Sequence, residues 1–85
     1  MLSTPVALDR SANLPLYRQI EEELRAAILD GRLRPGMRLP SVRALAAELR
    51  VARITVVTAY EQLAAEGYVE GRAGVGDETS ARVGS

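Results

Sequence analysis

A break of three residues between two amphipathic segments constrains the fold of this chain more than any other feature. The first segment follows Ser41, a good N-cap residue. Its apolar residues recur at helical spacing: Val42, Leu45, Ala46 and Leu49. The break covers residues 50–52, and a second segment begins near residue 53. A break this short is the length of the turn in a helix-turn-helix.

The segment after the break carries two conflicting signals. Its beginning, Ile54–Thr58, is rich in β-branched residues, which are typical of strands. Read as a helix over about residues 53–66, however, it places apolar side chains on one face: Val56, Ala59, Tyr60 and Leu63. Gly67 is suited to end that helix. Because the helical template accounts for more residues, the sequence predicts a helix, and the tyrosine on its apolar face is predicted to pack in the core.

The flanking segments complete the fold. Pro15 suits the start of an earlier helix and Gly31 its end. Pro35-Gly36 marks a turn, followed by room for a very short strand at residues 37–39. Residues 67–72 predict one strand of a hairpin, and residues 77–83 give a weaker signal for the second. The fold class is therefore mainly α with a small β hairpin, a three-helix winged helix-turn-helix.

The domain organisation follows from the same pattern. Residues 1–12 lack periodicity and are expected to be a flexible N-terminal arm. Residues 13–78 form the predicted winged helix-turn-helix, in which the third helix enters the major groove and the hairpin touches the backbone or the minor groove. Residues 79–85 are expected to be a tail, or a linker to a C-terminal domain outside the sequence.

The charged residues are unevenly distributed. The net charge is zero and all 11 basic residues are arginine, but between residues 32 and 53 six arginines face a single acid, Glu48. A local basic zone suggests binding to a polyanion, although a solvated arginine-rich surface is the alternative. The run Glu21–Glu23 is expected to be a solvated face rather than a metal site.

Composition excludes several classes of function. The chain has no cysteine and no histidine, so it lacks a disulfide framework, a thiolate metal site and the commonest general base. It has no lysine for a Schiff base, so we expect no enzyme and no cofactor in this chain. There is neither a long apolar run nor a signal peptide, so we expect a cytoplasmic protein with no membrane association.

Residues 14–76 resemble the N-terminal domain of GntR-family transcription regulators. The resemblance rests on four motifs: PLYRQI, the run G-x-L-x-P-G-x-x-LPS-x-R-x-LA, the run R-x-TV-x-x-AY-x-x-L, and EGY. It is strongest to the MocR-like branch, whose regulators add an aminotransferase-like domain that binds pyridoxal phosphate, and second to the YtrA-like branch. A MocR-like resemblance implies that pyridoxal phosphate, if used, binds a domain beyond residue 85.

The resemblance implies sequence-specific binding to a double-stranded DNA operator, and a homodimer would suit a repeated operator. It assigns DNA contacts to Arg43 in the second helix, to Arg53 and Thr55 in the third, and to Gly74 in the wing. The residues predicted to bind DNA are, in full, Arg43, Arg53, Ile54, Thr55, Thr58, Arg72 and Gly74. The chemistry agrees, since an arginine can bind two acceptors of guanine and an isoleucine can contact a thymine methyl.

Some residues depart from the family pattern. Ala52 stands where the family usually has a serine or threonine that caps the third helix, and Asp77 and Glu78 place two acids beside the wing. These residues favour an alternative function, a winged-helix dimerisation or protein-interaction module with weak or no DNA binding.

Overall fold

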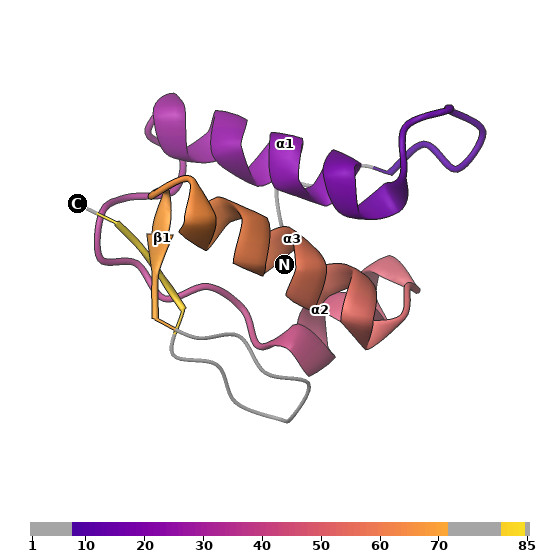
Figure 1. Cartoon of the computed structure of the whole chain (residues 1–85). Helices are drawn as coiled ribbons and strands as arrows, with labels where there is room; N and C mark the ends of the chain where they lie inside the picture. Colours follow the sequence, from indigo (N-terminus) through magenta and orange to yellow (C-terminus); the bar gives the residue numbers. More distant parts are fainter. Residues whose placement is uncertain (1–7, 72–80, 85) are drawn as a thin grey trace.

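The computed structural model describes residues 8–71 and 81–84, and Figure 1 shows how these segments are arranged. They form three α-helices and a two-stranded antiparallel sheet. The elements are α1 (Leu16–Leu29), α2 (Val42–Leu49), α3 (Arg53–Ala65), β1 (Val69–Glu70) and β2 (Arg82–Val83). The predicted fold class, mainly α with a small β hairpin, is confirmed.

The helix ends lie where the sequence predicts them. Pro15 directly precedes α1, and the Ser41 hydroxyl accepts a hydrogen bond of 3.0 Å from the Ala44 amide at the start of α2. Gly31 and Gly67 follow α1 and α3 with φ of +88° and +86°, a conformation that costs glycine little. The β-branched run that opens α3 is helical, so the helical interpretation of residues 53–66 is confirmed.

The core is built where α1 and α2 pack against α3. In Figure 1, α1 lies along α3, and α2 lies at the N-terminal end of α3. The largest fully buried side chains come from all three helices and from β2: Ile20, Leu24, Val42, Leu45, Val56, Tyr60, Leu63 and Val83. The Tyr60 hydroxyl donates a 2.8 Å hydrogen bond to the Pro40 carbonyl, and burial raises the pKa of this phenol. Tyr60 is thus a core residue, as predicted.

The sheet closes the core at the C-terminal end of α3. Val69 pairs with Val83 and Glu70 with Arg82, so the two buried valines share the inner face. The segment predicted as a short strand at residues 37–39 runs along the other edge of β2, where Leu39 donates to the Ala81 carbonyl (3.0 Å). Of the weaker strand predicted over residues 77–83, Arg82–Val83 is β-strand, and residues 77–80 lie outside the described part of the chain.

The expectation of a solvated face over Glu21–Glu23 is wrong for Glu21. The side chain of Glu21 is only 4% exposed, and it forms an ion pair with Arg25 one turn along α1. The same Arg25 reaches across to Glu66 at the end of α3 (3.0 Å). Glu21 follows the buried Ile20 directly, so it lies at the border of the α1–α3 contact, where an arginine offsets the cost of burying a carboxylate.

The segment before α1 is attached to the body of the domain. Within residues 1–12, expected as a flexible arm, the structure describes residues 8–12. The backbone of Asp9 exchanges two hydrogen bonds with the Gln19 side chain: Asp9 N donates to Oε1 (2.7 Å), and Nε2 donates to the Asp9 carbonyl (2.9 Å). Residues 1–7 lie outside the described residues, and the domain boundaries stay a prediction.

Candidate nucleic-acid interface

The first turn of α3 is exposed, whereas the rest of the helix is held in the core. Arg53 opens the helix with an exposed side chain, and Ile54 is 60% exposed. Val56 and Val57 then begin the buried face, which continues to Leu63. The helix therefore presents its N-terminal end at the surface while its remaining turns fix its orientation.

Two of the residues predicted to bind DNA, Thr55 and Thr58, lie on this helix and are half-buried. The amide of Thr55 donates to the Ala52 carbonyl (3.0 Å) at the helix start. One turn further on, the Thr58 hydroxyl donates to the Ile54 carbonyl (2.8 Å). The Thr58 hydroxyl proton is thus used within the helix, but its oxygen can still accept a hydrogen bond.

Arg43, the predicted DNA contact on α2, lies at the start of that helix. Arg43 is the second residue of α2 and its side chain is exposed. The helix that carries Arg43 packs on α3, and residues 50–52 join the end of α2 to the first turn of α3. The remaining two residues of the set, Arg72 and Gly74, lie outside the described residues, as do Asp77 and Glu78. Their assigned roles stay predictions.

The start of α3 has no side-chain cap. Ala52 occupies the N-cap position with an extended backbone (φ −66°, ψ 148°), and its methyl group cannot accept a hydrogen bond. The first N–H groups of a helix point along its axis and carry partial positive charge, which suits a phosphate or another anion. The missing cap therefore leaves the start of the helix to be stabilised by other contacts.

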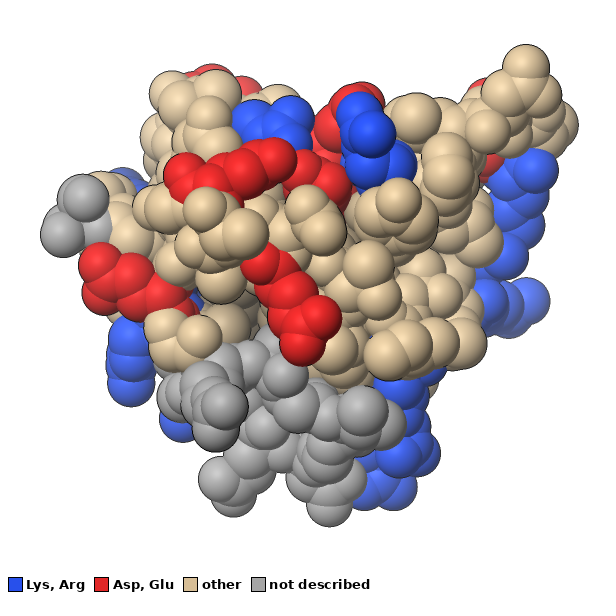
Figure 2. All heavy atoms as spheres, viewed as in Figure 1, with Lys and Arg blue, Asp and Glu red and all other residues tan. Residues whose placement is uncertain are grey.

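Acidic side chains and arginines are unevenly distributed on the surface. In Figure 2, acids gather over the face formed by α1 and α3, with arginines among them at the top, and other arginines lie along the right, lower and left margins. Ion pairs on and after α1 use three of the arginines: Arg18 with Glu22 (3.2 Å), Arg25 with Glu66 (3.0 Å) and Arg32 with Asp30 (2.9 Å). Within residues 8–71 and 81–84, neither Arg50 nor Arg53 forms an ion pair.

Comparison with known proteins identifies the family. The profile described as "Bacterial regulatory proteins, gntR family" matches residues 16–77, which span α1 to the wing. The chain belongs to the GntR family. Curated relatives of this GntR chain include the probable rhizopine catabolism regulatory protein MocR of Rhizobium meliloti, 51% identical over 71 residues. They also include the HTH-type pyridoxine biosynthesis transcriptional regulator PdxR of Corynebacterium glutamicum, 43% identical over 72 residues.

The alignments cover most of the GntR chain but a small part of these relatives. They take in 84% of the chain and 14% of MocR, and 85% of the chain and 16% of PdxR. Among solved structures, YtrA from Sulfolobus acidocaldarius, a GntR-family transcription factor, superposes with a TM-score of 0.83 at 34% identity, covering 96% of this chain and 82% of YtrA. The AraR DNA-binding domain in complex with operator ORE1 superposes with a TM-score of 0.70 at 27% identity, covering 92% of this chain and 90% of that one. Both the MocR-like and the YtrA-like resemblances are supported.

Sequence reasoning missed three polar residues that organise the GntR domain: Arg10, Gln19 and Glu21. Gln19 is 8% exposed and Glu21 is 3% exposed, although both flank Ile20 on the apolar face of α1. Polar side chains this close to a predicted apolar face are a signal that buried partners exist. The identity of those partners depends on contacts with distant segments.

In the described part of the chain, the longest helix has 14 residues, and no helix is apolar enough to cross a membrane.

Proposed function

We propose that this chain is the DNA-reading domain of a GntR-family transcription regulator, with α3 in the major groove of a specific double-stranded operator. One observation carries the proposal: an exposed arginine and isoleucine begin a helix whose later turns bury one face in the core. That arrangement lets a protein insert the end of a helix into a groove while the buried core fixes the orientation of the helix. The AraR complex supports the proposal, since a related domain of similar fold is bound there to an operator.

Within this proposal, Arg53 and Ile54 read base edges and Arg43 supports them from α2. Arginine binds the O6 and N7 acceptors of guanine, and isoleucine contacts the methyl group of thymine. Thr55 and Thr58 hold the adjacent backbone through their hydroxyl oxygens. Arg72 and Gly74 contact the backbone or the minor groove from the wing.

The test begins with selection of bound duplexes from a random pool, followed by affinity measurements over a range of salt concentrations. Arg53→Ala should weaken binding by about 1–3 kcal/mol and relax the preference at one base position. Arg43→Ala should also weaken binding. Arg32→Ala is the matched control, because Arg32 is exposed and pairs with Asp30 after α1, away from the start of α3. Absence of binding to every duplex at low salt would refute the proposal.

The same proposal covers the assembly of the protein, its location and its cofactor. Two copies of the domain would match two half-sites of an operator, as paired helix-turn-helix domains do. The proposal includes a cytoplasmic location, which DNA binding supports. Because this chain has no lysine for a Schiff base, any pyridoxal phosphate belongs to another part of a longer regulator. The sizes of MocR and PdxR, of which the chain matches 14% and 16%, are consistent with such a further part.

The second candidate function is a dimerisation or protein-interaction module. The uncapped start of α3 at Ala52 favours it, as do the acids Asp77 and Glu78 beside the wing. Light scattering that shows a tight homodimer, insensitive to salt, together with no shift of any selected duplex, would support this module instead of DNA reading.

A further inference from the structure

The turn between α2 and α3 has two features that weaken it. Arg50 adopts the left-handed conformation (φ 59°, ψ 48°), which is costly for any residue with a Cβ. Ala52 supplies no cap to α3. The turn closes with Arg50 N donating to the Ala47 carbonyl (3.3 Å) and Val51 N to the Ala46 carbonyl (3.0 Å). Neither feature adds a side-chain hydrogen bond to the segment that leads into α3.

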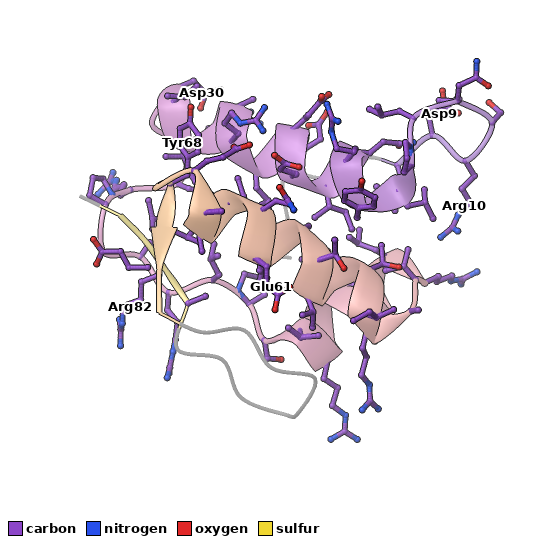
Figure 3. The ribbon with its side chains drawn as sticks, viewed as in Figure 1. Asp9, Arg10, Asp30, Glu61, Tyr68 and Arg82 are labelled. Carbon is purple, nitrogen blue, oxygen red and sulfur yellow. The ribbon has the colours of Figure 1, made fainter. Side chains whose placement is uncertain are left out.

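A side chain from outside the helix-turn-helix supports this turn. Arg10 Nη2 donates to the Leu49 carbonyl (2.7 Å) and to the Arg50 carbonyl (2.9 Å). The last carbonyls of a helix lack partners within it and carry partial negative charge, so a guanidinium there is favourable. Figure 3 shows Arg10 reaching from the turn before α1 toward the end of α2. The contact joins residues 39 and 40 positions apart in the sequence.

The base of Arg10 is itself fixed. Gln19, on α1, receives the Asp9 N–H at Oε1 (2.7 Å), and its Nε2 donates to the carbonyls of Asp9 (2.9 Å) and Leu14 (2.8 Å). Gln19 is 8% exposed, so these bonds are largely shielded from water. The Asp9 carboxylate accepts from the Ser11 N–H (3.1 Å) and hydroxyl (2.7 Å), which tightens the same turn. The guanidinium therefore approaches α2 from a position set by α1.

We propose that Asp9, Arg10 and Gln19 form an N-terminal latch that positions the α2–α3 turn for DNA reading. Arg10 is a positioning residue in this latch. Its Nη2 donates to two backbone carbonyls, and it acts on DNA through the orientation of the first turn of α3 relative to α2. The inference rests on the proposed function for its effect on DNA affinity. The latch itself is a property of the protein without DNA.

The experiment compares three variants of the whole chain: Arg10→Ala, Gln19→Met and the control Arg32→Ala. Arg10→Ala and Arg32→Ala each remove one exposed arginine, whereas Gln19→Met changes no charge. Amide hydrogen exchange in the absence of DNA is followed at Val51 and Thr55 and expressed relative to the core amide of Leu63, so that any global loss of stability cancels. We expect the relative exchange to rise about threefold to tenfold in Arg10→Ala and Gln19→Met, and to stay unchanged in Arg32→Ala.

DNA affinity is then measured for the same variants at several salt concentrations. A positioning role predicts binding weakened about threefold to tenfold by Arg10→Ala and by Gln19→Met, with the slope of log affinity against log salt unchanged, because no phosphate contact is lost. The proposal is overturned if turn exchange in either latch variant matches that of Arg32→Ala. It is also overturned if Arg10→Ala lowers the salt slope by about 0.9 without changing turn exchange, which would make Arg10 a phosphate contact. The exchange measurement needs no DNA, so failure of the latch is distinguishable from failure of DNA binding.

Discussion

At the scale of the residue, Glu21 shows how a buried carboxylate is tolerated in this domain. Burial raises the pKa of Glu21 above its ordinary value of 4.5, and the nearby Glu66 carboxylate raises it further, while Arg25 and Arg18 act in the opposite direction. Arg25 bridges the two carboxylates and so links the middle of α1 to the end of α3. Breaking one member of such a group leaves a buried charge with fewer partners.

This arrangement gives stability a defined dependence on pH. With the pKa raised in the folded state, the native protein binds more protons than the unfolded chain between 4.5 and the raised value. The Glu21 contribution to the free energy of unfolding is therefore present below pH 4.5 and falls as the pH rises through the raised pKa. Chemical denaturation at a series of pH values should show that Glu21→Gln removes this decline. Glu22→Gln, an exposed neighbour on the same helix, should retain it. Identical pH profiles for the Glu21→Gln and unaltered proteins would contradict the assignment.

Ala52, at the N-cap position of α3, affects the stability of the domain. Its backbone is already extended, as an N-cap requires, and only an acceptor is missing. Ala52→Ser should raise the free energy of unfolding by about 1 kcal/mol, measured by denaturant titration. Ala65→Ser, at the exposed last residue of α3, provides no N-cap and should not stabilise the protein. Equal effects at the two positions would show that the start of α3 needs no cap.

At the scale of the element, α2 and α3 end with the same backbone motif but with different residues. Gly67 takes the left-handed position after α3, where Tyr68 N donates to the Leu63 carbonyl (2.9 Å). Arg50 takes it after α2. The motif favours glycine because a Cβ is strained there. The bonds that close each motif come from the backbone, so the strain at Arg50 does not prevent the turn from forming.

Because both positions are left-handed, Arg50→Gly and Gly67→Ala are expected to change the stability of the protein in opposite directions. Arg50→Gly should stabilise the protein by up to about 1 kcal/mol, because the relief of strain exceeds the added entropy of the unfolded chain. The Arg50 carbonyl that accepts from Arg10 is retained in this variant. Gly67→Ala should destabilise by about 1 kcal/mol, although no atom lies within 4 Å of the new methyl group, because its φ is +86°. Thermal unfolding of both variants tests the pair, and destabilisation by Arg50→Gly would mean that the arginine side chain has contacts worth more than its strain.

At the scale of the whole molecule, one core joins α3 to α1, α2 and the sheet. Leu63 is fully buried on α3 within the cluster formed with α1, α2 and the sheet. Leu63→Ala should cost about 2–5 kcal/mol, a large part of the roughly 5–15 kcal/mol that holds a typical domain together. Leu29→Ala, at a residue that is 68% exposed, should change stability by less than about 0.5 kcal/mol. Guanidinium denaturation distinguishes the two, and a small effect of Leu63→Ala would mean that the core tolerates a cavity there.

The sequence by itself determined the order of elements, their ends and most of the core. Ser41, Gly31 and Gly67 have local conformational preferences that do not depend on distant contacts, so their positions predicted the helix ends. The 3.6-residue period of Val56, Tyr60 and Leu63 outweighed the β propensity of the run Ile54–Thr58, because burial of a whole face contributes more than intrinsic propensity. The exposed position of Ile54 follows from the same period, because Ile54 falls outside the face formed by these residues. Arg53 falls on that face but is exposed because it is the first residue of the helix.

Only the tertiary structure decided which distant groups meet. The packing of α1 and α2 against α3 brings Arg25 to Glu66, and the chain before α1 folds back so that Asp9 meets Gln19 and Arg10 meets Leu49. Local preference carries no information about such partners, since an arginine or glutamate is equally satisfied by water until folding excludes it. The sequence therefore determined where a reading helix begins, and the tertiary structure decided what holds its beginning in place.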